Sequence, residues 1–402
     1  MERLKEGITG PKGTHYYWLN GLRIVSSEKN FRLNMRCRMM YDFGYTDLSD
    51  DYQRVYSDRD GFDTDVRQLR VLGWGTIYDS VEFKIAFDFA NVRDIKDIWF
   101  RFRKLRYLRR FTFGHLREPF SLEALTSSSF RTFMERALPV DALGLGRNIG
   151  AMFSMPSLDE RRTFSLGFFY NTASLSNVNS AQDSISDANG FNITSRVTWL
   201  PVYEDEGRRL LHSGLGYSYG YRDDDIKTGS KPESYLVDKW LVDTGEFSAD
   251  RIDRVNAELA SVSGPLSFQG EYFHGFTDSD TAGDPDFRGY YMYAGYIFTG
   301  EHREYDTARG IFSRITPKHN FKIREKKWGA WEVALRHSYV DLNDKNITGG
   351  EERNFTLGLN WYTTGKTRFM FNYVHARVNQ QSASSLEDGY LNIFQTRFQI
   401  IF

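Results

Sequence analysis

The chain has 402 residues, with a mean hydropathy of -0.53, 16% aromatic residues and only 9 prolines. This combination is unusual for two or three soluble domains, and no stretch reaches the ~18 apolar residues that a transmembrane helix needs. A formal net charge of -1 gives no overall electrostatic steering, and a single cysteine excludes an intrachain disulfide. A membrane protein without spanning helices satisfies its backbone hydrogen bonds by closing a β-sheet.

The first thirty residues lie outside the predicted barrel. Residues 1–14 contain no apolar segment of the kind found in a secretory signal, so we expect the signal to have been removed and the chain to be trimmed. Residues 1–30, including Tyr16 to Ile24, are predicted to form an N-terminal extension or an extra hairpin. The remainder, residues 31–402, is predicted to be one domain.

Sixteen segments follow in which apolar and polar residues alternate, as is typical of β-strands with one apolar face. In chain order they are Phe31 to Tyr41, Arg67 to Tyr78, Val81 to Asn91, Asp97 to Arg103, Arg110 to Leu116, Ile149 to Met155, Arg162 to Tyr170, Phe191 to Pro201, Leu211 to Tyr221, Ile252 to Ser261, Leu266 to Gly275, Arg288 to Phe298, Trp328 to Tyr339, Glu352 to Tyr362, Thr367 to Val378 and Leu391 to Phe402. We therefore predict an all-β protein, a transmembrane antiparallel β-barrel of about 16 strands.

The connections alternate between two kinds. Turn signals at Asp79-Ser80, Gly264-Pro265 and Thr364-Gly365-Lys366 fall at alternate junctions. The other junctions carry longer polar segments that we expect to face outward, namely 42–66, 117–148, 171–190, 222–251, 276–287, 340–351 and 379–390. The segment 299–327 is long although it falls on the short-turn side, and we hypothesise that it folds back into the lumen.

The last strand carries the clearest membrane signal. Phe394, Phe398 and the terminal Phe402 share one phase, while Gln395 and Arg397 share the other, as in a tilted strand that is apolar outside and polar inside. A chain that ends on an aromatic residue of such a strand resembles an outer-membrane porin, in which the terminal aromatic is part of the assembly signal.

A more specific resemblance spans roughly residues 66–402. The predicted loop 117–148 and its flanks read "GHLREPFSLEALTSSSFRTFMERALPVDALGLGRNIG" from Gly114 to Gly150, and further matches read "GPLSFQGEY" from Gly264, "FTGEHREYD" from Phe298 and "GAWEVALRHSYVDLND" from Gly329. These segments closely resemble the phosphate-selective porin O and P family. The resemblance implies a trimer of sixteen-stranded barrels in the outer membrane of a Gram-negative bacterium, narrowed by loops that fold inward and lined by arginines that lead anions through.

Strand phase assigns an excess of cations to the lumen, because side chains opposite the aromatic face point inward. The predicted anion path consists of Arg32, Arg36, Arg38, Arg101, Arg103 and Arg196. Further inward cations are Arg70, Lys84, Arg110, Arg254, Arg336, Arg368 and Arg397, and the inward acids are Glu82, Asp88, Asp97, Glu258, Glu271, Glu332 and Glu352. Each single arginine could instead pair with a loop acid and hold that loop in place.

The predicted constriction loop, residues 117–148, carries balanced charge. Its arginines are Arg117, Arg131, Arg136 and Arg147, and its acids are Glu118, Glu123, Glu135 and Asp141. We expect the pairs Glu135-Arg136 and Arg147-Asn148 to anchor the loop to the wall more than to bind ions. No lysine occurs between Lys104 and Lys227, so the loop lacks the lysines that strictly phosphate-selective members of the family present, which places high-affinity phosphate selection in doubt.

The function predicted from these patterns is a passive channel for small anions, above all phosphate or related oxyanions. The alternative is a weakly selective general diffusion porin. No catalytic motif, metal-ligand spacing or cofactor cradle is present in the sequence, and His115, His337 and His375 fall on or near the outward phase. The expected partners are outer-membrane lipid and lipopolysaccharide, small anions and two further copies of the chain, with no nucleic acid.

Overall fold

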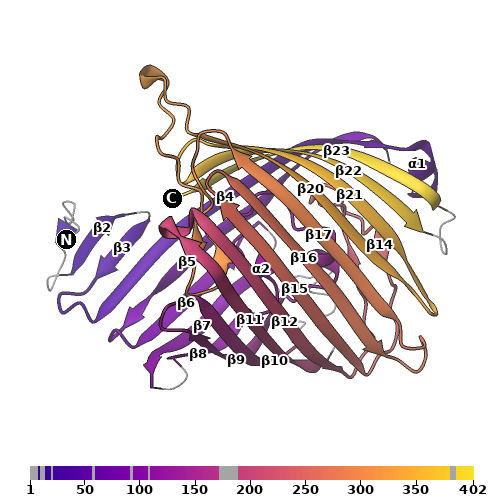
Figure 1. Cartoon of the computed structure of the whole chain (residues 1–402), viewed down its shortest axis with the longest axis horizontal. Helices are drawn as coiled ribbons and strands as arrows, with labels where there is room; N and C mark the ends of the chain where they lie inside the picture. The colour runs from indigo at the N-terminus through magenta and orange to yellow at the C-terminus, as the bar shows by residue number, and fades with distance from the viewer. Residues whose placement is uncertain are drawn as a thin grey trace.

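A single antiparallel sheet dominates the computed structural model, which describes residues 8–9, 14–19, 21–56, 59–90, 94–106, 109–171, 189–380 and 386–402. The sheet has 19 strands, of which 16 close into a barrel (Figure 1). All sixteen predicted strands are present. Among the described residues, no helix is long and apolar enough to span a membrane.

The barrel strands are β4 (Phe31–Leu48), β5 (Gly61–Ile77), β6 (Val81–Asp88), β7 (Asp94–Leu105), β8 (Arg109–Arg117), β9 (Arg147–Pro156), β10 (Arg162–Tyr170), β11 (Gly190–Glu204), β12 (Arg209–Arg222), β15 (Arg251–Ser263), β16 (Leu266–Asp278), β17 (Asp286–Ile297), β20 (Ala330–Asp344), β21 (Ile347–Tyr362), β22 (Thr367–Gln380) and β23 (Leu386–Ile401). The last strand pairs with the first, with Leu391 opposite Leu48 and Ile401 opposite Arg38. This pairing closes the barrel.

The N-terminal residues extend the same sheet. β2 (His15–Trp18) and β3 (Leu22–Val25) form a hairpin, and β1 (Ile8–Thr9) pairs with β2. β3 pairs with the first residues of β4, which lie beyond the end of β23. The extension therefore continues the wall at the end of the barrel where the chain enters.

Side chains alternate between the two faces of each strand and so give the barrel wall an apolar outer face and a polar inner face. In β16 the outward side chains Leu266, Tyr272 and Phe276 are exposed, whereas the inward Gln269 and Glu271 are buried. Because successive side chains point to opposite faces, each strand presents an apolar outer surface and a polar surface to the lumen.

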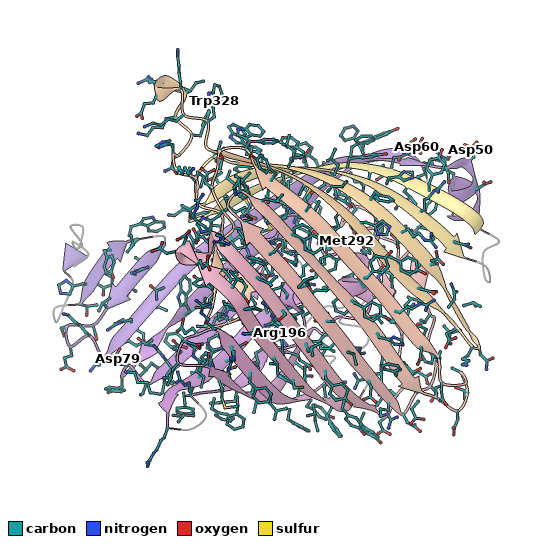
Figure 2. The ribbon with its side chains drawn as sticks, viewed as in Figure 1. Asp50, Asp60, Asp79, Arg196, Met292 and Trp328 are labelled. Carbon is teal, nitrogen blue, oxygen red and sulfur yellow. The ribbon has the colours of Figure 1, made fainter. Side chains whose placement is uncertain are left out.

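The two ends of the barrel differ as predicted, with a tight turn at Asp79 at one end and the loop that carries Asp50 and Asp60 at the other (Figure 2). Several loops are shorter than predicted. The predicted loop 340–351 is wrong, because β20 and β21 continue to a tight turn at Lys345 and Asn346. These strand ends carry exposed or half-buried polar residues, such as Asp344 and Thr348, so their sequence resembles that of a loop. The same effect shortens 42–66 to 49–60 and 276–287 to 279–285; parts of 171–190 and 379–390 lie outside the described residues.

The long segment between β17 and β20 divides into two parts. Its first part includes β18 (Tyr305–Asp306) and β19 (Ile311–Phe312) and packs inside the barrel against Leu200 and Leu210. Its second part, with the short 3₁₀ helix η3 (Ile323–Glu325) and Trp328, projects from the barrel end (Figure 2). The hypothesis that this segment enters the lumen therefore holds for its first part.

Candidate conduction pathway

The constriction loop lies inside the barrel and fills one side of it. It contains two short helices, α2 (Leu122–Leu125) and α3 (Leu138–Ala142). Phe120, Phe133, Leu138 and Leu143 join an apolar cluster with lumen-facing residues of β15, β16, β17, β20 and β21. Burial of this apolar surface holds the loop against that wall, and the lumen beside the opposite wall stays open.

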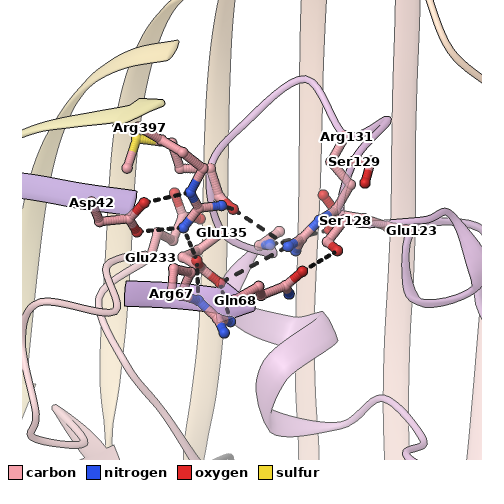
Figure 3. Close-up of polar contacts among 12 residues, drawn as sticks. Asp42, Arg67, Gln68, Glu123, Ser128, Ser129, Arg131, Glu135, Glu233 and Arg397 are labelled. Atoms are coloured by element: carbon pink, nitrogen blue, oxygen red, sulfur yellow. Dashed lines mark hydrogen bonds and ion pairs between the residues drawn. The ribbon is translucent and has the colours of Figure 1, made fainter. Parts of the chain in front are cut away.

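Ion pairs fix the middle of the loop (Figure 3). The Glu135 carboxylate accepts from Arg67 Nε at 2.8 Å and from Arg397 Nη2 at 2.6 Å. Arg397 also pairs with Asp42 at 2.5 Å. Glu135 thus joins the loop to β5 and β23, in keeping with the anchoring role expected for it.

Backbone groups of the loop also bind wall side chains. The amides of Leu122 and Glu123 donate to the Glu271 carboxylate at 3.0 and 2.8 Å. Arg368 donates to the carbonyl oxygen of Arg131 at 2.7 Å. Burial lowers the pKa of the Arg131 guanidinium to about 9, which leaves it charged at neutral pH.

The open part of the lumen is a cavity of about 1170 Å³ with a basic lining. Its described lining contains fourteen arginines and three lysines but only four carboxylates. The cations are Arg23, Lys29, Arg32, Arg36, Arg38, Arg67, Arg70, Lys84, Lys96, Arg101, Arg110, Arg117, Arg131, Arg136, Arg147, Arg196 and Arg309, and the acids are Glu82, Asp88, Asp97 and Asp306.

Five of the six arginines predicted to lead anions line this cavity. Arg36 lies 4.9 Å from the Trp74 ring centre, and Arg38 donates to Ser127 and Ser129 of the constriction loop. Arg103 is not among the lining residues and pairs with Glu82 at 3.2 Å.

The other three predicted path arginines that line the cavity are Arg32, Arg101 and Arg196. Arg32 lies at the exposed edge, 3.4 Å from Asp79. Arg101 pairs with Glu82 at 3.5 Å, while the buried Arg196 binds Glu258 through two nitrogens. These three arginines therefore differ in burial and in how closely a carboxylate pairs with them.

The four predicted loop arginines also line the cavity. Arg147 pairs with Asp97 at 3.1 Å, and Arg117 donates to the Leu145 carbonyl at 3.1 Å. Burial lowers the pKa of the Arg136 guanidinium. These arginines both hold the loop and contribute charge to the cavity surface.

The strand pattern missed several lining residues, namely Arg23, Lys29, Arg67, Lys96, His115 and Arg309, and the last two show why. His115 was predicted near the outward face, but it is buried and lines the cavity. The preceding Gly114 has φ +126, so the regular alternation is broken just before it. Arg309 belongs to the inserted segment, which has no strand phase from which its direction could be predicted.

Within the described ranges, no group of three or more His, Cys, Asp or Glu side chains is arranged to hold a metal ion.

A closed sixteen-stranded barrel with loops folded into a polar lumen defines an outer-membrane porin. Solved porins share the fold: an anion-selective porin from Comamonas acidovorans has a TM-score of 0.53 and 11% identity, covering 92% of this chain and 100% of that one. The outer-membrane channel DcaP of Acinetobacter baumannii has a TM-score of 0.56 and 11% identity, covering 93% of this chain and 98% of that one. The trimer form of OmpT from Vibrio cholerae has a TM-score of 0.55 and 10% identity, covering 92% of this chain and 99% of that one.

Residues 33–402 match the family Phosphate-selective porin O and P, and the chain belongs to this family. Porin O of Pseudomonas aeruginosa is 24% identical over 432 residues, covering 95% of this chain and 91% of that protein. An uncharacterized protein of Caulobacter vibrioides is 26% identical over 388 residues, covering 94% and 74%. Family and fold place the protein in the outer membrane of a Gram-negative bacterium.

Proposed function

We propose that this porin is a passive channel for small anions, above all phosphate or related oxyanions. The observation that supports the proposal is the cavity lining, whose described residues include seventeen Arg and Lys side chains against four carboxylates in a chain with a formal net charge of only -1. A narrow lumen with low-dielectric walls concentrates such a charge excess on passing ions.

Arginine suits oxyanions because its guanidinium stays charged and its paired donors match the spacing of phosphate oxygens. We propose that Arg36, Arg38 and Arg101 form the path through the cavity, with Arg32 at its edge. Arg36 and Arg38 are two residues apart on β4, which places them about 6.6 Å apart along the strand, a separation suited to passing an ion between weak sites.

A weakly selective diffusion pore is the competing function, and a specific observation favours it. Many lining cations already have acidic partners, such as Arg70 with Asp88 at 2.7 Å and Lys84 with Asp97 at 2.9 Å. The chain also has no lysine between Lys104 and Lys227, so the constriction loop contains none. We therefore propose anion preference through several weak sites and not high-affinity phosphate capture.

We also propose a homotrimer surrounded by outer-membrane lipid and lipopolysaccharide. The trimer form of a structural neighbour, OmpT, supports this assembly. The exposed aromatic side chains of the outer wall, such as Phe100, Phe168 and Phe371, supply the apolar surface that either lipid or neighbouring copies would cover.

Reversing charge on β4 tests the proposed path. The double substitution Arg36→Glu and Arg38→Glu should shift the reversal potential in a KCl gradient toward cations, because the local charge changes by four units beside the cavity. Arg162→Glu is a matched control, since Arg162 is exposed on β10 and is not among the lining residues. An unchanged ion preference in the double variant would contradict the path.

A further inference from the structure

We propose that Arg309 is a selectivity determinant of this channel, held at the cavity by the inserted segment 301–316 through a buried cluster of wall side chains. The inference rests on the proposed function, because it concerns the selection of anions in the same cavity. It adds a residue from outside the barrel wall and the structure that positions it.

The inserted segment is fixed by its own packing. Tyr305, Ile311 and Phe312 pack with the wall residues Leu200 and Leu210 in one apolar cluster. Gly310 approaches the wall so closely that a Cβ there would lie 2.7 Å from Thr198 Oγ1, and its φ of +64 favours glycine. The segment therefore lies directly against β11, although it enters from the short-turn end.

A buried cluster of polar side chains, here the clamp, joins the segment to the wall. Arg196 binds the Glu258 carboxylate at 2.8 and 2.7 Å. His212 Nε2 lies 3.0 Å from the same carboxylate, and the Tyr305 hydroxyl lies 2.7 Å from His212 Nδ1. All four side chains are buried, so every polar contact in the clamp replaces one with water.

Wall arginines also hold the backbone on both sides of Arg309. Arg196 Nη2 donates to the Gly310 carbonyl at 2.8 Å, and its Nη1 lies 3.5 Å from the Arg309 carbonyl oxygen. Arg110 donates to the Ala308 carbonyl at 3.4 Å. Three successive carbonyl oxygens are thus bound by the barrel wall, which fixes the position from which the Arg309 side chain extends.

The Arg309 side chain itself remains available to ions. It is exposed, lines the cavity and has no side-chain hydrogen bond or ion pair with any described residue. Its charge acts on Arg101 and Lys84, which face the same space. Both of these have acidic partners, in Glu82 and Asp97, whereas no carboxylate among the described residues forms an ion pair with Arg309.

Reaction of a cysteine at this position tests the proposal directly. In a Cys37→Ser background, Arg309→Cys should lower the chloride-to-potassium permeability ratio by about twofold or more, because a cavity cation is lost. A cationic methanethiosulfonate reagent should restore the ratio, and an anionic one should lower it further. Arg324→Cys is the matched control, because Arg324 is exposed on η3 outside the barrel.

The clamp is tested separately with Tyr305→Phe in the Arg309→Cys protein. This change removes the hydroxyl near His212 and leaves every charge in place, so a smaller response to both reagents is expected if the clamp positions residue 309. An equal response would overturn the role of the clamp. An unaltered ratio in Arg309→Cys would overturn the role of Arg309 while wild-type anion selectivity remained; a wild-type channel without anion selectivity would instead refute the proposed function.

Discussion

The lumen arginines differ in what their guanidinium groups contact, and this difference decides what each can do. Arg196 is buried, and its donors are used by Glu258 and by the Gly310 carbonyl. Arg36 lies at the cavity surface beside Trp74. Both were assigned inward from the same alternation, yet burial and partners fit Arg196 to a positioning role and leave Arg36 facing the cavity of the proposed ion path.

The Arg196–Glu258 pair gives a prediction at the residue scale. Glu258→Ala should lower the free energy of unfolding by about 3–5 kcal/mol, because it leaves a buried guanidinium without its carboxylate. Glu204→Ala removes an exposed pair with Arg209, whose side chains are 52% and 67% exposed, and should cost less than about 1 kcal/mol. Urea-induced unfolding in lipid measures both, and equal losses would contradict the assigned burial.

At the scale of elements, the constriction loop combines an apolar face with a few charged anchors. The apolar cluster that includes Phe120 and Phe133 presses the loop against the wall, while Glu135 joins it to β5 and β23. The loop therefore has both a non-directional attraction and specific contacts that fix where it lies. This arrangement leaves the cavity on the side of β4 to β11.

The anchor at Glu135 gives a pH prediction. Burial alone would raise the pKa of this carboxyl, but Arg67 and Arg397 hold it well below its usual range. A lowered pKa stabilises the folded state above the unfolded value of about 4.3, and this contribution is lost as pH falls further. Glu135→Gln should therefore lower Tm by a constant amount between pH 5 and 8 and by less below pH 4. A difference that grows on acidification would contradict the ion pairing.

Contact between the loop and β12 gives a second prediction for this element. A Cβ at Gly216 would overlap the carbonyl oxygen of Phe120, so Gly216→Ala should push the start of the loop away from the wall and toward the cavity. Single-channel conductance should fall. Gly73→Ala is the control, because a Cβ there meets only Leu33 Cδ1 at 3.8 Å, and its conductance should match the wild type.

At the scale of the whole molecule, the barrel was predictable because alternation is local. The apolar and polar faces of each strand are visible in that strand's own residues, so all sixteen strands were predicted. The ends of β20 and β21, on either side of Lys345, are polar and were therefore predicted as a loop. The contacts of Arg196 with Gly310 join residues more than a hundred positions apart, and no local pattern encodes them. The position of Arg309 in the cavity was not predicted for the same reason, because it depends on how the inserted segment folds against the wall.

The whole molecule also sets the sign of the field that an ion meets. The formal charge of the chain is -1, yet its described cavity lining is strongly basic, so the acids lie mainly elsewhere. The proposed anion selectivity depends on where the charges lie and not on the net charge of the chain. A measurement on the intact channel is therefore more decisive than any single substitution.

The reversal potential of the purified protein in a planar bilayer, across a KCl gradient and before and after adding phosphate, tests the central claim most directly. The basic cavity predicts a chloride-selective potential and a phosphate-dependent reduction of the chloride current. A potential that is cation-selective or near zero would contradict anion selection and leave a general diffusion porin of this family.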